Sequence, residues 1–350
     1  MPKVAVIGTT AWGMTLGVVL ARKGLEVSLW ARSSEEAERL TTKRPHLIPG
    51  ATLPPQLSFT NSLKESLARC AAVILAVPSQ TMRQNVKLIK GYLRASMLIV
   101  SAAKGLEVGS NKRMSQVIAE EIDPRFHVNI CVLSGPNLFK EILKGLPASA
   151  VVAAEDDAVA RKAQRLLTAP NFSVYTNHDV IGVELGGALK NVIALGAGMV
   201  DGLGYGDNAK AAFVTRGLTE MAALGVTLGA SPLTLSGLAG LGDLIATCAS
   251  PLSRNHYVGV ELTKGRPLKE IIASMAGVAE GVSTAAAVWD IAQKYRLEMP
   301  ITEKIYRVLY NGADAHRAIT ELLGARGKHE LAGRKWKLFS FFRRRRRHRG

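Results

Sequence analysis

Residues 4–13 decide the fold, and they read Val-Ala-Val-Ile-Gly-Thr-Thr-Ala-Trp-Gly. The apolar run at Val4–Ile7 indicates a buried strand, and Gly8 indicates a turn at its end. The pattern after the turn predicts a helix over Trp12–Arg22. Such a turn suits a dinucleotide pyrophosphate, because the N–H groups of the helix N-terminus face the phosphates. The G-x-G-x-x-G motif is incomplete, since Thr10 replaces its middle glycine. A tight turn without a ligand would give the same pattern.

Strand-like runs continue to about residue 153, with helical segments between most of them. The further strands predicted are Glu26–Trp30, Ala72–Val77, Met97–Ser101, Asn129–Leu133 and Ala150–Ala153, and the further helices include Ser79–Leu88 and Lys112–Glu121. This alternation predicts a parallel sheet covered on both faces. From about residue 178 to 323 the pattern is helical, and Asp207 is the expected N-cap of a helix over Asp207–Gly225.

The predicted fold class is therefore α/β, with a Rossmann-type doubly wound N-terminal domain followed by an all-α C-terminal domain. We place the nucleotide-binding domain at residues 1–180, the helical catalytic domain at 181–325, and a basic tail at 326–350. A ligand cleft is expected between the two domains.

Composition favours a soluble protein of the cytoplasm. Hydrophobic residues make up 47% of the 350 residues and charged residues 21%. Cys70, Cys131 and Cys248 form no C-x-x-C pair, so neither a disulfide framework nor a metal site is predicted. A strand predicted from Lys3 leaves no room for a signal peptide, and no uninterrupted apolar run looks long enough to span a bilayer.

The net charge of +17 is concentrated at the C-terminus, where residues 334–349 carry nine basic side chains and no acid. The rest of the chain carries +8, which does not indicate a specific nucleic-acid site. Trp336 and Phe339 are among the apolar residues beside the arginine run, a composition that suits weak peripheral contact with an anionic membrane. A solvated tail would have the same composition.

Arg32 follows the second predicted strand, nineteen residues after Gly13. An acid is usual in this region where NAD binds, whereas an arginine can pair with the 2′-phosphate of NADP. The first acid here is Glu35, so NADP(H) is favoured, with NAD(H) as the alternative. Alternatively, Arg32 is a solvated surface residue without a role in coenzyme binding.

Polar residues follow two predicted strands at the edge where parallel sheets bind ligands. Lys104 comes after Met97–Ser101, and Gly135 and Asn137 come after Asn129–Leu133. Each of these residues could belong to an ordinary solvated loop, but two such positions at one edge of the sheet favour a ligand-binding site.

Lys190 is the one charged residue between Leu185 and Val200. A lysine buried in such surroundings must be paired, lower its pKa or face a cleft, and it suits proton transfer to a carbonyl oxygen. Asp243 stands equally alone among glycines and aliphatic residues, so it is the expected partner of Lys190. A snorkelling surface lysine is the alternative.

Ser253, Arg254 and Asn255 supply a hydroxyl, a guanidinium and an amide in one short segment. That set suits a substrate phosphate. Ser253 would equally serve as the N-cap of a helix, and a helix N-terminus also favours anions.

Together these segments resemble the bacterial NAD(P)-dependent glycerol-3-phosphate dehydrogenase family. The resemblance runs from residue 3 to about 323 and is strongest over residues 186–204 and 237–255. It implies that Lys190 is the general acid and base. It implies a substrate site made of Lys104, Gly135, Asn137, Lys190, Asp243, Ser253, Arg254 and Asn255. It implies a cofactor site made of Gly8, Thr10, Ala11, Trp12, Gly13, Arg32, Lys104, Phe139, Arg254, Val278 and Glu280.

The reaction implied by the resemblance is reversible hydride transfer from NAD(P)H to dihydroxyacetone phosphate, giving sn-glycerol 3-phosphate for phospholipid synthesis. The family is usually dimeric, so a homodimer is expected. Thr10 stands where the family has glycine, Ala11 where serine is usual, and Phe139 where alanine is usual, while Asn137 takes a small polar position. These changes bear on cofactor affinity and on the choice between NAD and NADP. The alternatives are a related β-hydroxyacid or ketopantoate-type reductase and a non-catalytic nucleotide-sensing protein.

Overall fold

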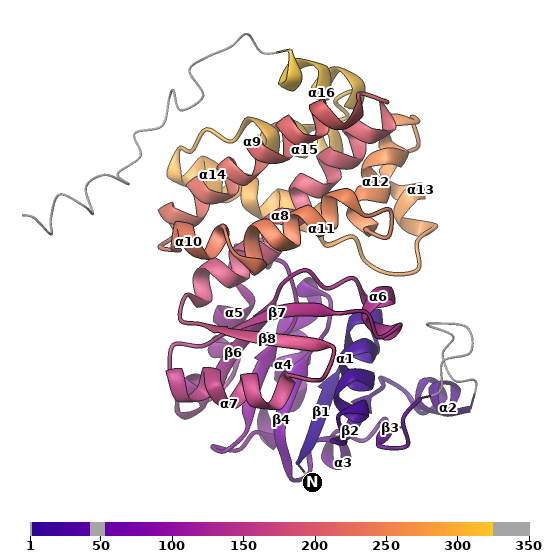
Figure 1. Ribbon diagram of the computed structural model, residues 1–350, viewed down its shortest axis with the longest axis vertical. Coiled ribbons are helices and arrows are strands. Elements are labelled where there is room, and N and C mark those ends of the chain that lie inside the picture. The colour runs from indigo at the N-terminus through magenta and orange to yellow at the C-terminus, as the bar shows by residue number, and fades with distance from the viewer. Residues whose placement is uncertain (1, 43–52, 325–350) are drawn as a thin grey trace, which may run out of the picture.

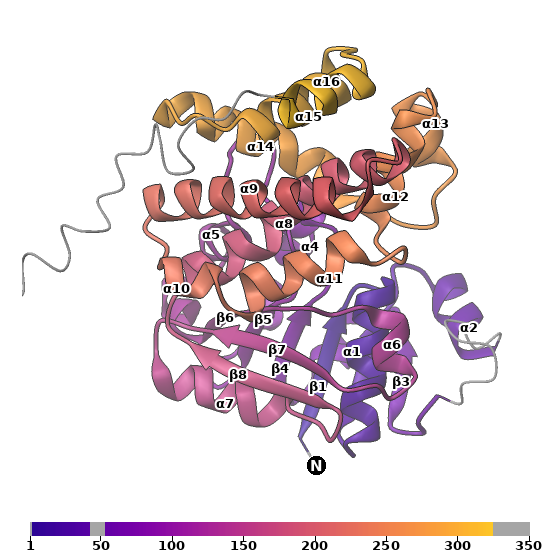
Figure 2. The ribbon, with the colours of Figure 1, turned by 45° about the horizontal axis from the view of Figure 1, so that its top comes forward.

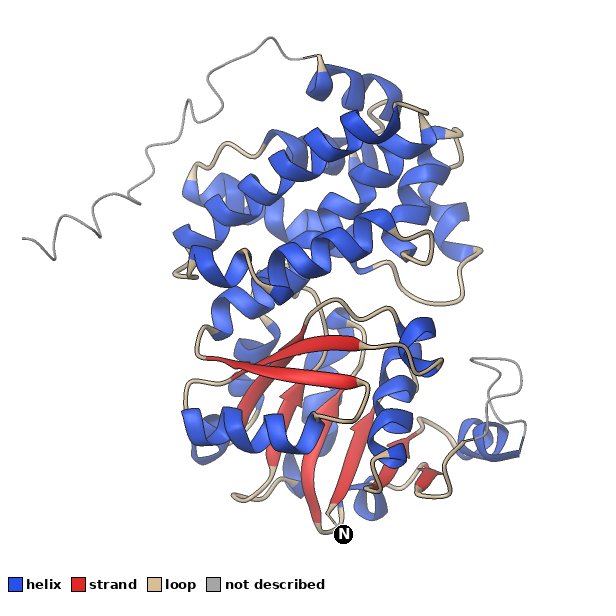
Figure 3. Cartoon of the chain, in the orientation of Figure 1, coloured by secondary structure: helices blue, strands red, loops and turns tan. Residues whose placement is uncertain are grey.

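A computed structural model of the chain describes residues 2–42 and 53–324. One eight-stranded sheet with flanking helices forms the N-terminal part, and helices alone form the C-terminal part (Figures 1 and 3). The strands are β1 (Lys3–Ile7), β2 (Glu26–Trp30), β3 (Leu57–Thr60), β4 (Cys70–Leu75), β5 (Leu98–Ser101), β6 (Ile130–Ser134), β7 (Ala148–Ala153) and β8 (Phe172–Asn177). The predicted fold class is confirmed, and the last strand ends three residues before the first helix of the helical part begins at Val180.

The strand order is β3-β2-β1-β4-β5-β6-β7-β8, and every neighbouring pair is parallel except β6 with β7. A wholly parallel sheet was therefore the wrong expectation for the last two strands. The only helix joining β6 to β7 is α6 (Phe139–Leu143), whose five residues span about 7.5 Å. This helix is too short to carry the chain back along β6, so β7 returns beside it in the opposite direction.

Strands β3 and β8 were not predicted, because both lie at the edges of the sheet. In β8, Phe172 and Val174 are buried whereas Ser173 and Tyr175 are exposed. An edge strand that is half exposed lacks the continuous apolar run that marks the central strands of a parallel sheet.

Both faces of the sheet are covered by helices, as the alternation of strands and helices predicted (Figure 2). Besides α6, the helices of this part are α1 (Ala11–Arg22), α2 (Ser34–Thr42), α3 (Leu63–Leu67), α4 (Met82–Ile89), α5 (Met114–Glu121) and α7 (Asp157–Leu167). Val4 and Val6 of β1 pack with α1, α6 and α7, whereas Ala5 and Ile7 pack with α3, α4 and α5.

The helical part is built around α8 (Val180–Gly202), which lies among the other helices in both ribbon views (Figures 1 and 2). Its neighbours are α9 (Gly206–Thr227), α10 (Pro232–Leu235), the π-helical turn η4 (Leu238–Gly242), α11 (Asp243–Ala249), α12 (Arg254–Thr263), α13 (Leu268–Ala273), α14 (Glu280–Tyr295), α15 (Pro300–Tyr310) and α16 (Ala315–Leu323).

By length and composition alone, α8 and the segment 232–249 are apolar enough to cross a membrane. Neither is an uninterrupted apolar run, because α8 contains Glu184 and Lys190 and the other segment contains Asp243. Within the fold, 89% of the apolar window of α8 is buried, which is the behaviour of a core helix.

Helix α9 begins one residue earlier than predicted, so Asp207 is not its N-cap. Tyr205 occupies the cap position and makes no side-chain capping bond, and Asp207 lies inside the first turn. Gly204 and Gly206 adopt positive φ angles of 70° and 78°, which let the chain turn into the helix before Asp207. The carboxylate still favours the helix, because an acid near the N-terminus interacts well with the helix dipole.

Helices α8 and α12 pack with their backbones almost in contact. A Cβ atom added to Gly198 would lie 2.0 Å from the carbonyl oxygen of His256, and one added to Gly259 would lie 1.9 Å from that of Leu195. Only glycine permits this approach, which brings the start of α12 against the middle of α8.

The three cysteines Cys70, Cys131 and Cys248 are buried and free. Within residues 2–42 and 53–324, no group of three histidine, cysteine or acidic residues is placed to hold a metal ion. The basic tail, residues 326–350, lies outside the described residues, and so do the predictions that depend on it.

Candidate active site

The site begins where two neighbouring parallel strands end. Lys104 follows β5 and Gly135 follows β6, and the Lys104 ammonium donates a hydrogen bond of 2.7 Å to the carbonyl oxygen of Gly135. Gly135 has a φ of 134°, a conformation that glycine adopts without strain. The two turns therefore meet at one edge of the sheet, as the sequence predicted.

Lys190 and Asp243 are paired, as predicted from their isolation in the sequence. The Lys190 ammonium lies 2.9 Å from Oδ1 of Asp243, and it donates a second hydrogen bond of 2.6 Å to the hydroxyl of Thr247. The side chains of Lys190 and Asp243 are 8% and 2% exposed. A lysine has three N–H donors, so one donor of Lys190 is not used by these two contacts.

Lys104 binds the same carboxylate from the other side, a contact that the sequence interpretation did not predict. Its ammonium lies 2.6 Å from Oδ2 of Asp243. Burial lowers the pKa of Lys104 to about 8, because desolvation and the neighbouring Lys190 charge outweigh the attraction of Asp243. Burial alone would raise the pKa of Asp243, but the charges and hydrogen bonds of the two lysines hold it below its ordinary value. The three groups together carry one net positive charge, which suits an anionic substrate.

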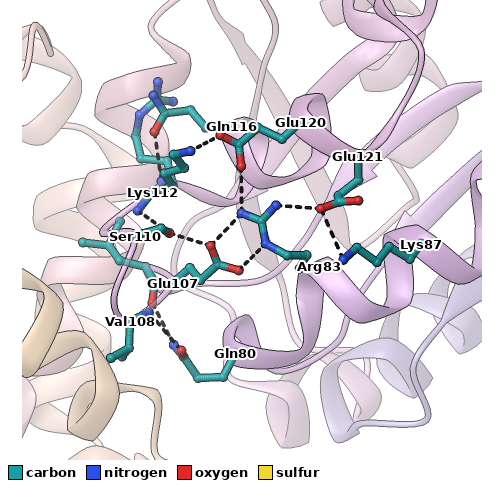
Figure 4. A network of polar contacts seen from close by, with 12 residues as sticks. Gln80, Arg83, Lys87, Glu107, Val108, Ser110, Lys112, Gln116, Glu120 and Glu121 are labelled. Atoms are coloured by element: carbon teal, nitrogen blue, oxygen red, sulfur yellow. Dashed lines mark hydrogen bonds and ion pairs between the residues drawn. The ribbon is translucent and has the colours of Figure 1, made fainter.

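The loop that carries Lys104 is held against helices α4 and α5 and the short turn before α4 (Ser79–Thr81) by the network drawn in Figure 4. Gln80 binds the loop backbone at Leu106 and Val108, with distances of 2.7 and 3.0 Å. Arg83 makes two bonds of 2.8 Å to the Glu107 carboxylate and also binds the carboxylates of Glu120 and Glu121. Glu107 is only three residues from Lys104, so this network restrains the loop close to the site.

Ser253, Arg254 and Asn255 begin α12, and the structure gives each a different environment. Ser253 caps the helix by accepting a bond of 3.2 Å from the His256 N–H, which confirms the predicted N-cap. The Asn255 amide donates to the side-chain oxygen of Asn191 at 2.8 Å and accepts from the Gly281 N–H at 2.9 Å. Arg254 is exposed, and its guanidinium lies against Gly277. Asn255 thus mainly links α12 to α8 and α14, whereas the exposed Arg254 side chain can bind a ligand.

The glycine-rich turn has the close backbone packing that a phosphate turn needs. A Cβ atom on Gly13 would lie 2.2 Å from the carbonyl oxygen of Gly8, and one on Gly8 would lie 2.7 Å from that of Ala76. Thr10 is accommodated as the N-cap of α1, since its hydroxyl accepts from the Gly13 N–H at 3.1 Å and donates to Ala76 at 2.7 Å. No acid lies in the first turn of α1, which leaves the positive end of the helix dipole for an anion.

Three residues, one in the first turn of α1 and two at or after the end of β6, carry buried polar atoms without a partner among the described residues. The indole nitrogen of Trp12, the side-chain oxygen of Asn137 and the hydroxyl of Ser134 make no hydrogen bond to any residue that the structure describes. Trp12 and Phe139 both pack against the core of the same sheet face. Buried polar groups are normally satisfied, so these three atoms mark places where a bound molecule could supply the partner.

Glu280 reaches across from the helical part to the sheet edge. Its carboxylate accepts hydrogen bonds from the Ser79 N–H at 3.0 Å and the Ser79 hydroxyl at 2.5 Å. Burial raises the pKa of Glu280 despite these bonds and the charge of the nearby Arg254. Val278, two residues earlier, is 42% exposed.

Arg32 lies at the end of β2 and is exposed, as the interpretation of a 2′-phosphate contact requires. The sequence interpretation missed the acid beside it. Glu36 accepts a hydrogen bond of 2.7 Å from the Thr9 hydroxyl and one of 3.0 Å from the Arg32 backbone N–H. Its carboxylate therefore joins the glycine-rich turn to the end of β2.

Thr247 and Asn191 were also missed as site residues. Thr247 is four residues after Asp243 on α11 and so shares its helix face, a spacing that was available in the sequence. Asn191 follows Lys190 and bonds Asn255, Gly187 and the Lys104 carbonyl oxygen. No local pattern distinguishes this amide, because its partners come from three parts of the chain.

Comparisons with known proteins identify one family for both the N-terminal and the C-terminal part of the chain. Residues 3–160 match the family model described as the NAD-dependent glycerol-3-phosphate dehydrogenase N-terminus, and residues 179–320 match the model of its C-terminus. The chain is 61% identical to the glycerol-3-phosphate dehydrogenase [NAD(P)+] of Dehalococcoides mccartyi over 99% of this chain and 97% of the relative. It is 46% identical to the Geobacter sulfurreducens enzyme of the same name, over 92% and 96%. The crystal structure of glycerol-3-phosphate dehydrogenase from Coxiella burnetii superposes with a TM-score of 0.86 at 35% identity, covering 92% of this chain and 98% of that one.

Proposed function

Because the chain belongs to the NAD-dependent glycerol-3-phosphate dehydrogenase family, we propose that it reduces dihydroxyacetone phosphate reversibly to sn-glycerol 3-phosphate. The observation that carries this proposal is the buried Lys190 ammonium, held by Asp243 and Thr247 and joined through Asp243 to Lys104. These two cations at the sheet edge suit a substrate with a carbonyl group and a phosphate.

The described residues fit a nicotinamide dinucleotide. A bound pyrophosphate would use the tight packing of Gly8 on Gly13 and the N-terminus of α1, whose first turn contains no acid. A neighbouring group of the cofactor could accept a hydrogen bond from the Trp12 indole, which has no partner among the described residues. Gly8, Thr10, Ala11, Trp12, Gly13, Arg32, Lys104, Phe139, Arg254, Val278 and Glu280 form the proposed cofactor site. When bound, the reduced nicotinamide supplies the hydride.

Lys190 is proposed to move the proton. Two of its N–H groups are directed to Asp243 and Thr247, and the third can donate to the carbonyl oxygen of the substrate. Asp243 keeps the amine oriented and stabilises its positive charge. In the reverse direction the neutral amine would accept the hydroxyl proton.

Lys104 and Arg254 are proposed to neutralise the substrate phosphate or the developing oxyanion. Both come from elements that are fixed by other contacts, Lys104 by the network of Figure 4 and Arg254 by the capped start of α12. Gly135, Asn137, Ser253 and Asn255 complete the proposed substrate site.

An absorbance assay at about 340 nm tests the proposal, because oxidation of the reduced nicotinamide is followed directly. Dihydroxyacetone phosphate is offered with NADH and with NADPH, and ketopantoate and small β-keto acids are offered in parallel. The proposal requires turnover with dihydroxyacetone phosphate well above that with the other substrates. Preference for a keto acid would favour a related reductase, and no nicotinamide binding at all would favour a protein without this activity.

We propose further that the protein acts as a homodimer in the cytoplasm and supplies phospholipid synthesis. The names of the relatives support an enzyme that acts on glycerol 3-phosphate, and the use of this product in phospholipid synthesis is what the family resemblance implies. Weak contact of the basic tail with an anionic membrane is proposed on composition, namely nine basic residues beside aromatic ones. Sedimentation with anionic liposomes, with and without residues 334–350, tests this contact, and equal binding by both forms would end the idea.

A further inference from the structure

Glu184 on α8 joins the helical part to the sheet part close to the site. Its side chain is 6% exposed, and its carboxylate binds Arg113 and Ser115 at the start of α5. One oxygen accepts a hydrogen bond of 2.7 Å from the Ser115 N–H. The other accepts from the Ser115 hydroxyl at 2.6 Å and from the Arg113 guanidinium at 2.5 Å. Glu184 thus supplies a negative charge to the N-terminus of α5, whose own first turn contains no acid.

The same contact holds the loop that carries Lys104. Leu106 and Arg113 form an antiparallel bridge, which pairs the two ends of this loop. Inside the bridge, the Glu107 N–H donates to the carbonyl oxygen of Lys112 at 3.0 Å. Leu106 is fully buried and packs in the hydrophobic core of the helical part. Because Lys104 is only two residues before Leu106, its position depends on how the paired loop is held against α8.

Glu184 and Lys190 lie on one helix, six residues and about 9 Å apart along its axis. The paired loop carries Arg113 and Lys104 in the same way. At the far end of both elements, the ammonium groups of Lys104 and Lys190 bind opposite oxygens of Asp243, at 2.6 and 2.9 Å. The contact at Glu184 therefore controls how far Lys104 lies from Lys190.

We propose that Glu184 is a positioning residue for the reaction, holding the Lys104 loop against α8 so that Lys104 meets Lys190 at their shared carboxylate. Glu184 binds the start of α5, and it acts on the two lysines through the loop and through α8. The proposal rests on the proposed function for the chemical role of the lysines, whereas the placement of Lys104 can be measured without substrate.

The test compares two buried carboxylates that each bind the N-terminus of a neighbouring helix. Glu184→Gln removes the charge that holds the start of α5. Glu220→Gln is the matched control, because Glu220 of α9 accepts from the Ile301 N–H at 2.7 Å and the Thr302 N–H at 3.1 Å, at the start of α15. We expect both variants to lose stability, and only Glu184→Gln to change the surroundings of Lys104.

The first measurement is the pH dependence of Lys104 labelling by acetic anhydride, followed by mass spectrometry without substrate. Desolvation lowers the pKa of Lys104 to about 8, with Asp243 raising it and Lys190 lowering it. A loop released from α8 would admit water to Lys104, so its pKa would rise towards the ordinary value of a lysine. The exposed Lys87 serves as the internal reference for labelling. The second measurement is kcat/KM for dihydroxyacetone phosphate across the same pH range.

In Glu184→Gln we expect the midpoint of Lys104 labelling to move up by about one pH unit. The ratio of kcat/KM at about pH 9 to that at about pH 7 should then rise about fivefold, because more of Lys104 stays charged. In Glu220→Gln both quantities should stay as in the unaltered protein. An unmoved midpoint in Glu184→Gln, or the same shift in both variants, would overturn the proposal, since Glu184 would then serve stability alone.

Ser115→Ala provides a milder variant if Glu184→Gln does not fold. It removes the hydroxyl bond of 2.6 Å and keeps the ion pair with Arg113, so we expect a smaller shift in the same direction. No shift in that variant would count against the proposal. If the unaltered protein fails to reduce dihydroxyacetone phosphate while Lys104 labelling shifts as stated, the proposed reaction is refuted and the anchoring of the Lys104 loop by Glu184 stands.

Discussion

Lys104 and Lys190 come from different parts of the fold, yet their ammonium groups bind opposite oxygens of one carboxylate, at 2.6 and 2.9 Å from Asp243. Lys104 belongs to the loop after β5, and Lys190 to the middle of α8. The carboxylate therefore joins the sheet edge to the helical core. It also allows two cations to lie together in a buried site, which neither could do alone.

Removing this carboxylate should damage both stability and activity. Asp243→Asn keeps the shape but leaves two buried cations without their anion, so we expect a loss of about 3–5 kcal/mol in the free energy of unfolding. Urea denaturation measures this loss. The control is Asp290→Asn on the exposed face of α14, which should change stability by less than about 0.5 kcal/mol. Equal stability of the two variants would refute the buried triad.

Lys190 should be required for the chemical step and not for coenzyme binding. We expect Lys190→Ala to lower kcat by roughly a hundredfold to ten-thousandfold, because the proton donor is lost. Coenzyme affinity, read by nicotinamide fluorescence, should stay close to that of the unaltered protein. Near-normal turnover in this variant would remove Lys190 from the mechanism.

Lys104 should set a pH limit on activity. With its pKa lowered to about 8, the group is an ammonium below that pH and a neutral amine above it. If the positive charge binds substrate, kcat/KM for dihydroxyacetone phosphate falls as pH rises through about 8. Lys104→Arg should move this fall to higher pH, since a guanidinium stays charged. Lys87→Arg, on the exposed face of α4, serves as the control, and a shift in that variant too would contradict the assignment.

Arg254 should contribute to substrate affinity. We expect Arg254→Ala to raise KM for dihydroxyacetone phosphate about 10- to 100-fold, the value of one charge-assisted contact to a phosphate. Initial-rate kinetics measure the change. Arg161→Ala removes an exposed arginine from α7 and should leave KM unchanged. An unaltered KM in Arg254→Ala would refute the phosphate assignment.

The contact between α8 and α12 should tolerate no side chain. A Cβ atom on Gly198 would meet the His256 carbonyl oxygen at 2.0 Å, so we expect Gly198→Ala to destabilise the fold by about 3 kcal/mol. Gly91→Ala is the matched control, because nothing lies within 4 Å of its added Cβ. Similar urea midpoints for the two variants would show that α12 can move away from α8 without cost.

The arrangement of the site could be predicted in part, because some of its residues are unusual in their own surroundings. Lys190 and Asp243 are isolated charges in apolar runs, and their pairing followed from the cost of burying either alone. Glu36 and Asn191 give no such signal. Glu36 lies on a helix with other acids, and its importance comes from Thr9, a partner twenty-seven residues earlier.

The sequence by itself determined the strand–turn–helix at residues 4–22, the change to helices near residue 178 and the charged residues that need partners. These features depend on burial pattern and on local propensity, which neighbouring residues encode. Tertiary structure alone decided that β7 runs against β6, that Lys104 shares Asp243 with Lys190, and that Glu36 faces the glycine-rich turn. Lys104 and Asp243 are 139 residues apart, and a contact over that separation depends on how whole elements pack against one another.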